Sequence, residues 1–287
     1  MPHPFDATLK SLGKDHAADF VAMFDAPTTE TVTPLNVDLS TVTTSADLVF
    51  GLGDPLKEVV HIDFQAGANR KKGRAVLVYN ALLHENYEVP VHSVLVLLRP
   101  SADHSEVTGE VAYAARPGRS RMEFGYEIVR LWQVPAEEFL RGPLGTLPLA
   151  VLGGLPAGTD RQAGLTEVVR SVLERLAAEA PPGWLERLQV SMAELLALVV
   201  KRKEVRNIFG GAGVMLTPGT PVYEGLVDIG VERQTKLHIL KLGKRKLGEA
   251  DEAIRTKLEA IDDIERLERI FDRAADAPSW DDLLATP

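Results

Sequence analysis

The sequence predicts an α/β protein in which helices flank a mixed sheet, followed by a mostly helical C-terminal region. Three observations predict this class. Segments with strand and helix patterns follow one another through the first 135 residues. The run VHSVLVLL at 91–98 is almost wholly apolar, as in a strand buried on both faces. Late in the chain, apolar residues recur every three or four positions, as in amphipathic helices.

The N-terminal part is expected to begin with a helix over 5–24, where large apolar residues stand near helical spacing. Strands are expected next at 35–42, 46–52 and 58–65, in a stretch rich in threonine, valine and proline. Between the second and third strands, GDP at 53–55 supplies the residues that hairpin turns favour.

A second helix is expected over 68–87 and should end before Pro90. The buried strand at 91–98 follows, with further strands at 106–114 and 123–133. The pattern therefore divides the chain at about residue 135.

The remainder reads as a glycine- and proline-rich stretch followed by helices. Residues 136–160 are either a linker or a tightly packed irregular segment. Residues 161–287 are expected to be helical, at 160–178, 183–199, 200–209 and 223–275. The apolar stripe from Ile254 to Ile270 must pack against something, so a homo-oligomer formed through the C-terminal helices is one option.

Composition excludes several classes of protein. The absence of cysteine excludes disulfides, thiolate catalysis and cysteine-ligated metal sites. No apolar run approaches the roughly 20 residues that cross a bilayer, and the N-terminus lacks a secretion signal, so a cytoplasmic protein without membrane contact is expected. A net charge of -9 argues mildly against coating of nucleic acid, although a local basic cluster can still bind it.

The stretch HIDFQ at 61–65 carries the main chemical signal. In a strand, His61, Asp63 and Gln65 share one face. If the hairpin closes symmetrically about Pro55, Asp47 lies opposite Asp63, and two adjacent carboxylates repel each other. A magnesium ion would remove the conflict, and Gln65 could then hold a water. A sheet that faces solvent shows the same spacing, so spacing alone leaves both interpretations open.

These residues also resemble a known family. Asp47 in ADLVFGL, followed by Asp63 and Gln65 in HIDFQ, resembles the PD-(D/E)XK nuclease core in the variant of the Rpn-type recombination-promoting nucleases, also called transposase-like proteins. The resemblance extends over about residues 5–135 and includes the motifs FDATLK and NRKKGRAVLVYNALLHENY. The C-terminal segment that begins at Leu237 looks like the helical domain often attached to such nucleases.

The resemblance implies an αβββαβ endonuclease core, a Mg²⁺ (or Mn²⁺) cofactor and DNA as the substrate, with a possible link to recombination or mobile DNA. It makes Asp47 and Asp63 metal ligands, Gln65 the water-orienting residue and Asp6 an additional catalytic acid. Two positions depart from the pattern. Asp63 stands where relatives usually have glutamate, and Ser45 precedes the first motif where relatives often have arginine.

Basic residues next to HIDFQ are the candidate DNA contacts. Arg70, Lys71, Lys72 and Arg74 either bind phosphates or form a solvated turn and helix face. Further basic runs at 201–206 and 241–246 are either an extension of that track or exposed helix faces. The departures from the motif leave a second hypothesis beside the endonuclease, namely a catalytically lapsed module that binds DNA or another protein.

Overall fold

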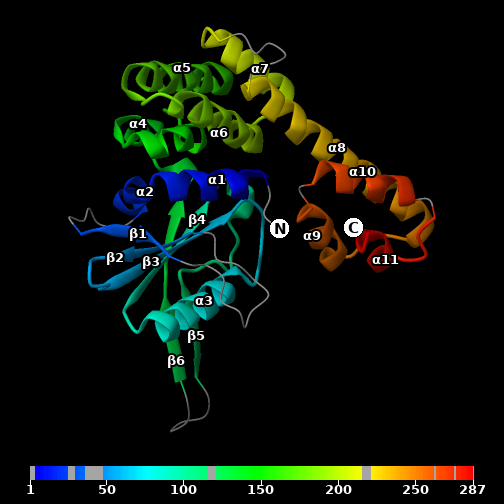
Figure 1. The fold of residues 1–287 in the computed structure, drawn as a ribbon, viewed down its shortest axis with the longest axis horizontal. Helices are drawn as coiled ribbons and strands as arrows, with labels where there is room; N and C mark the ends of the chain where they lie inside the picture. Colours follow the sequence, from blue (N-terminus) through cyan, green and yellow to red (C-terminus); the bar gives the residue numbers. More distant parts are fainter. Residues whose placement is uncertain are drawn as a thin grey trace.

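The computed structural model describes residues 4–24, 30–35, 48–114, 121–214, 221–261, 263–274 and 276–286. Two short helices open the chain and a mixed sheet follows (Figure 1). The N-terminal elements are α1 (Pro4–Asp15), α2 (Ala17–Phe24), β1 (Val32–Pro34), β2 (Leu48–Leu52), β3 (Glu58–Gln65), α3 (Lys72–Tyr87), β4 (Val91–Leu97), β5 (Glu110–Ala114), β6 (Arg121–Gly125) and β7 (Glu127–Arg130).

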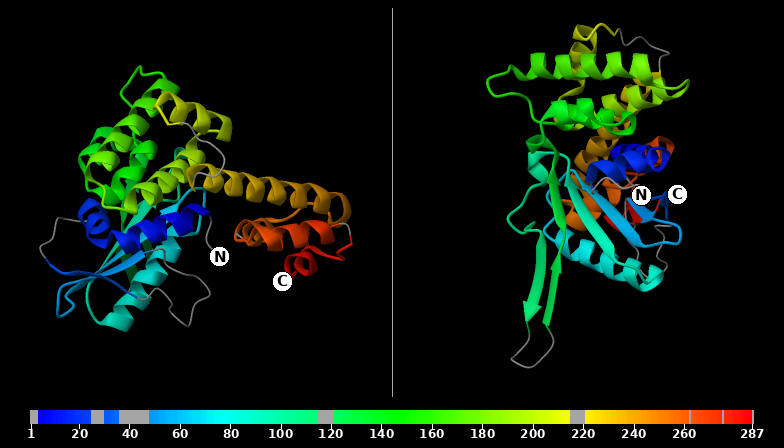
Figure 2. Two further views of the ribbon diagram at one scale, coloured as in Figure 1. Left: turned by 45° about the horizontal axis from the view of Figure 1, so that its top comes forward. Right: turned by 90° about the vertical axis from the view of Figure 1, so that its left-hand side faces the viewer.

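The main sheet has the strand order β1-β2-β3-β4-β7. β2 runs antiparallel to β1 and β3, whereas β4 runs parallel to β3 and β7, so the predicted mixed α/β sheet is confirmed. Strands β5 and β6 form a separate antiparallel pair that projects from the body (Figure 2). As predicted, the last five residues of β4 are all buried.

Helices cover both faces of the main sheet. α3 lies on one face, and α1 and α2 lie on the other beneath the later helices (Figure 1). Side chains that alternate along β3 explain this division, because Val60, Ile62 and Phe64 join the core under α1 and α2, and Val59 packs with Tyr79 of α3.

The C-terminal region consists of helices, as predicted. They are α4 (Ala136–Arg141), α5 (Arg161–Glu179), α6 (Trp184–Val199), α7 (Arg202–Gly211), α8 (Pro221–Leu247), α9 (Glu252–Glu259), α10 (Ile264–Arg273) and α11 (Trp280–Leu284). Three 3-10 helices also occur in the chain: η1 (Pro100–Ala102) after β4, η2 (Leu131–Gln133) after β7, and η3 (Leu144–Leu152) after α4. η3, inside the segment 136–160, is buried from Gly145 to its end.

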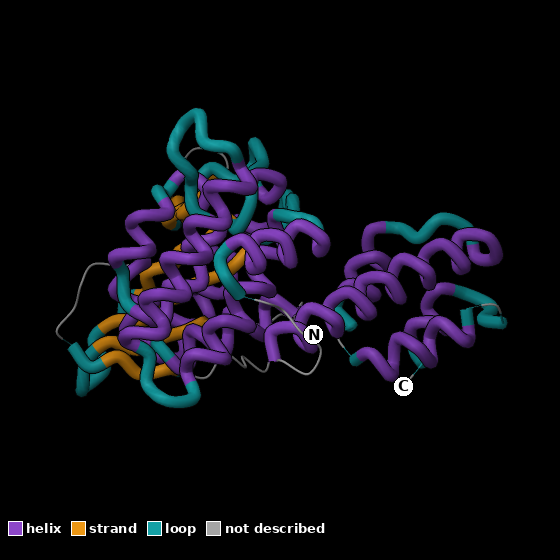
Figure 3. Tube along the Cα trace, turned by 90° about the horizontal axis from the view of Figure 1, so that it is seen from above, coloured by secondary structure: helices purple, strands orange, loops and turns teal. Residues whose placement is uncertain are grey.

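The two largest hydrophobic cores divide the described chain between a body and a C-terminal unit. One core runs from Leu9 to Phe209 and unites the sheet with α5, α6 and α7. The other lies between Ile239 and Leu284, in the last turns of α8 and in α9–α11. α8 packs on α6 and then extends to the C-terminal unit, which stands beside the body (Figures 1 and 3).

Several predicted boundaries differ from those in the structure. The opening helix breaks at His16 into two helices, and the helix expected from residue 68 begins at Lys72. The expected strand at 35–42 lies almost wholly outside the described residues, and β1 is found at Val32–Pro34 instead. β5 begins only at Glu110, and the strand expected over 123–133 is replaced by β6, β7 and η2.

The continuous helix predicted over 223–275 is also wrong. α8 ends before Gly248, whose φ of 84° favours glycine. New helices then begin at caps, where the carboxylate of Asp251 accepts a hydrogen bond from Ile254 N and that of Asp263 from Arg266 N. Within the described ranges, no helix is both long and apolar enough to cross a membrane.

Candidate active site

β3 places its polar residues beneath α3. His61, Asp63 and Gln65 alternate with apolar residues, so they lie on the opposite side of the sheet from Phe64. Phe64 contacts the rings of Phe20 and Phe24 at centroid distances of 6.5 and 6.4 Å. The apolar face therefore fixes the strand, and the acid is carried on the face that α3 covers.

Asp63 is a buried carboxylate with a lysine partner. The residue is 3% exposed, and its neighbour across the parallel strand pair is the apolar Leu95. The Nζ of Lys72, the first residue of α3, donates a hydrogen bond to Asp63 Oδ1 at 2.7 Å. An isolated charge is costly to bury, and this ammonium supplies the opposite charge beside the carboxylate.

His61 belongs to a neutral hydrogen-bonded network next to this ion pair. Its Nδ1 lies 3.1 Å from Oγ of Ser93, its partner in the β3–β4 register, and Asn80 Nδ2 of α3 donates to the same oxygen at 3.0 Å. Burial lowers the pKa of His61 to about 4, so the ring is neutral at pH 7. Its Nε2 is buried and has no hydrogen-bond partner among the described residues.

Gln65 lies at the end of β3 with a partly buried side chain. Its Nε2 donates a hydrogen bond to the carbonyl oxygen of Gly67 at 2.6 Å. The amide is thus held by its own turn, two residues after Asp63. This turn connects β3 to the basic N-terminus of α3.

Three of the four predicted DNA contacts form an exposed cationic cluster, which we call the α3 cluster. Arg70, Lys71 and Arg74 are exposed, and none forms an ion pair with a described acid. Lys72 differs, because its side chain is only 15% exposed and is turned towards Asp63. The sequence therefore groups four cations that the structure assigns to two environments.

Two predicted catalytic residues are not placed by the structure. Asp47 lies outside the described residues, one position before β2, and Asp6 is in α1 without a described side chain. Of the predicted residues, the structure therefore brings together Asp63, Gln65 and Lys72. No group of three metal-ligating side chains is found in the part of the chain that the structure describes.

Sequence reasoning missed two polar residues that join separate elements of the body, one of them at the end of β3. Arg99 follows β4, and its guanidinium donates to the carbonyl oxygens of Ala66 and Leu198, so it joins the end of β3 to α6. The signal is an arginine directly after a buried parallel strand. Glu194 of α6 accepts a hydrogen bond from Thr8 of α1, and burial raises the pKa of Glu194 to about 7.

Comparison with protein-family models, curated proteins and solved structures finds no match for this chain. Its candidate function therefore depends on the residues themselves.

Proposed function

We propose that this chain is a metal-dependent DNA endonuclease of the PD-(D/E)XK type, in which Asp47 and Asp63 hold Mg²⁺ or Mn²⁺. The observation that carries the proposal is the register of the β2–β3 hairpin. Leu48, the residue after Asp47, pairs with Ile62, the residue before Asp63. If the same pairing continued by one residue, Asp47 would stand opposite Asp63, and the proposal requires this arrangement.

The donor set fits a small hard cation. Magnesium is commonly bound by one or two carboxylates, with waters and substrate oxygens completing its coordination. Asp63 offers one buried carboxylate, and we expect Asp47 to offer the second. A bound Mg²⁺ supplies Lewis-acid polarisation of a phosphoryl oxygen and a more acidic water.

The remaining residues have distinct roles in this proposal. Lys72 balances the charge of Asp63 at 2.7 Å and lies beside the carboxylate, as a phosphate-neutralising cation would. Gln65 orients the attacking water through its amide, and Asp6 adds an acid from α1. The α3 cluster contacts phosphates on either side of the cleaved bond, because such contacts position DNA without reading its sequence.

The same ion pair also favours a second candidate function. Asp63 is almost wholly buried and is already compensated by an ammonium, an arrangement that is stable without any metal. A nuclease fold that keeps this pair and no longer cuts would act as a module that binds DNA or another protein.

Nicking of supercoiled plasmid in Mg²⁺, Mn²⁺ or EDTA tests the proposal. We expect metal-dependent nicking by the wild type and a loss of roughly hundredfold or more in Asp63→Asn and Asp47→Asn. Glu85→Gln removes an exposed acid from α3 and is the matched control. If the wild type does not nick, or the aspartate variants nick as fast as the control, the endonuclease proposal is wrong and the module is favoured.

A further inference from the structure

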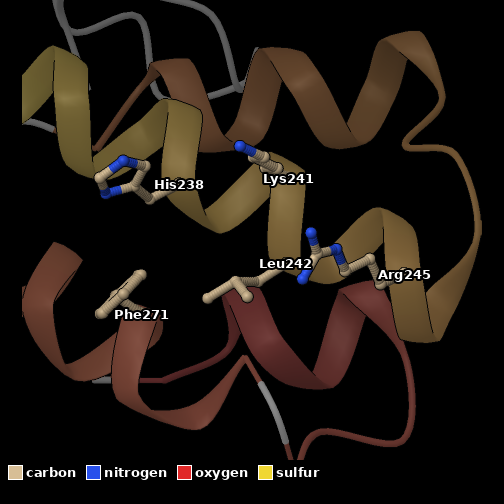
Figure 4. Close-up of a pocket in the computed structure, with 5 residues that line it drawn as sticks. All are labelled: His238, Lys241, Leu242, Arg245 and Phe271. Atoms are coloured by element: carbon tan, nitrogen blue, oxygen red, sulfur yellow. The ribbon is translucent and has the colours of Figure 1, made fainter.

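A shallow hollow lies on the C-terminal unit between α8 and α10. Its volume is about 270 Å³, and it is lined by His238, Lys241, Leu242 and Arg245 of α8 and by Phe271 of α10 (Figure 4). His238 and Phe271 lie at one end of the hollow and Arg245 at the other, with Lys241 and Leu242 between them. This volume is just below the usual range of ligand pockets, roughly 300–1,000 Å³, so the hollow has room for one small group.

Helical spacing builds the α8 wall of the hollow. Residues 238, 241, 242 and 245 are three or four positions apart and therefore share one side of the helix. On α10, Leu267 and Ile270 fill the core, which leaves Phe271 half-buried at the surface. The rings of His238 and Phe271 are 6.0 Å apart, and His238 Nε2 lies 2.8 Å from Gln234 Nε2.

The cations beside the hollow differ from their neighbours in pairing. Lys241 and Arg245 are exposed and form no ion pair with any described residue. In the same unit, Lys244 pairs with Glu249 and Lys257 pairs with Asp281, each at 2.7 Å. No acid is among the described residues that line the hollow, so it combines two cations without an acidic partner there with an aromatic end.

We propose that this hollow is a second DNA site, which binds an unpaired nucleotide of single-stranded DNA. Aromatic side chains stack on bases with about 1–3 kcal/mol for each base, and cations attract the backbone phosphates. A duplex hides the faces of its bases, so the rings select a single strand. The inference rests on the proposed function only in that DNA is the polymer. It specifies in addition that the DNA is single-stranded and that the C-terminal unit contacts it.

Binding of a dye-labelled oligothymidylate of about twenty nucleotides to the full chain tests the inference by fluorescence anisotropy. EDTA is present throughout, so that no metal-dependent cleavage contributes. The double variant Lys241→Gln/Arg245→Gln should weaken binding roughly tenfold at 0.1 M salt. The slope of the logarithm of the binding constant against the logarithm of the salt concentration should become shallower by about 1.4, the effect of two lost phosphate contacts on a single strand. The matched control, Lys244→Gln/Lys257→Gln, removes two paired cations and should bind within about twofold of wild type.

A ring variant tests the stacking contact separately. Phe271→Leu keeps an apolar side chain against the core and should weaken binding about fivefold with the salt dependence unchanged. If its melting curve shows that the C-terminal unit has unfolded, the charge variant alone decides. The affinity for a duplex of the same length should fall no more in the Lys241→Gln/Arg245→Gln variant than in the control.

Four results would overturn the inference. The wild type does not bind the oligothymidylate, the charge variant binds it as tightly as the control, or the charge variant loses as much affinity for duplex as for the single strand. The fourth is a charge variant whose oligomeric state changes by light scattering while its affinity for DNA does not. The last result would assign the hollow to a second copy of the chain. If the binding experiment fails but nicking depends on the aspartates, only the second DNA site is refuted. If nicking fails but the variants lose binding as expected, only the endonuclease proposal is refuted.

Discussion

Replacing Lys72 by methionine tests how the body keeps a carboxylate buried. The variant removes the ammonium 2.7 Å from Asp63 Oδ1 and leaves an acid that is 3% exposed. Loss of one partner of a buried ion pair costs about 3–5 kcal/mol, and the lower limit applies because Lys72 retains some contact with water. At roughly 2–4 °C for each kcal/mol in a chain of this size, the melting temperature of the body should fall by about 10 °C.

A double-mutant cycle separates this interaction from other effects of the substitutions. Asp63→Asn combined with Lys72→Met removes both charges, so we expect the double variant to be more stable than the sum of the single losses by about 2 kcal/mol. Urea denaturation measures all four proteins. Because Trp280 lies in the C-terminal unit, a Trp280→Phe background makes the fluorescence report on the body, through Trp132 and Trp184.

Metal addition links this cycle to function. In Lys72→Met the carboxylate no longer has the ammonium beside it, so Mg²⁺ should raise the melting temperature of this variant more than that of wild type. A cost below about 1 kcal/mol with no coupling would refute the reasoning about the ion pair. A variant that loses stability as expected but gains nothing from Mg²⁺ or Mn²⁺ would refute metal binding at Asp63.

The remaining predictions concern pH and packing. Because the pKa of Glu194 is about 7 when folded and 4.5 in the unfolded chain, its contribution to stability is fully present below about pH 4.5 and is lost, by at most about 3 kcal/mol, as pH rises through 7. The difference in unfolding free energy between wild type and Glu194→Gln, measured by urea denaturation at several pH values, should follow this dependence. In Gly243→Ala the new Cβ would lie 2.1 Å from the ring of Trp280, so calorimetry should show a loss of about 1–3 kcal/mol from the C-terminal unit. Gly210→Ala meets nothing within 4 Å and should gain up to about 1 kcal/mol, and equal effects of the two alanines would contradict this steric argument.

Local pattern predicted the part of the fold that carries the candidate site. β3 has the bounds expected from its alternation, and Leu48 pairs with Ile62, as a hairpin that closes about Pro55 requires. Such a result is possible because the period of a strand and the length of its turn together determine register. The run at 91–98 likewise needed only its apolar content.

Details that depend on contacts between distant elements were beyond the sequence. The sequence groups Lys72 with three phosphate-binding candidates, and only the start of α3 at this residue and its packing on β3 turn it towards Asp63. The segment 241–246 is one basic run in the sequence, yet its cations differ in the structure. Lys244 has an acidic partner from the next loop, whereas Arg245 lines the hollow between α8 and α10.

The net charge of the chain gives the α3 cluster and the hollow the same role in the proposed binding of DNA. A chain with a formal charge of -9 repels DNA on average, so the proposed DNA binding requires places where cations are uncompensated. The α3 cluster is one such place and the hollow is another. α8 joins the body to the C-terminal unit as a helix of 27 residues, about 40 Å long, that packs on α6. A single strand of DNA that is long enough to span both places would bind the second one at a raised effective concentration, whereas a shorter strand would gain nothing from it.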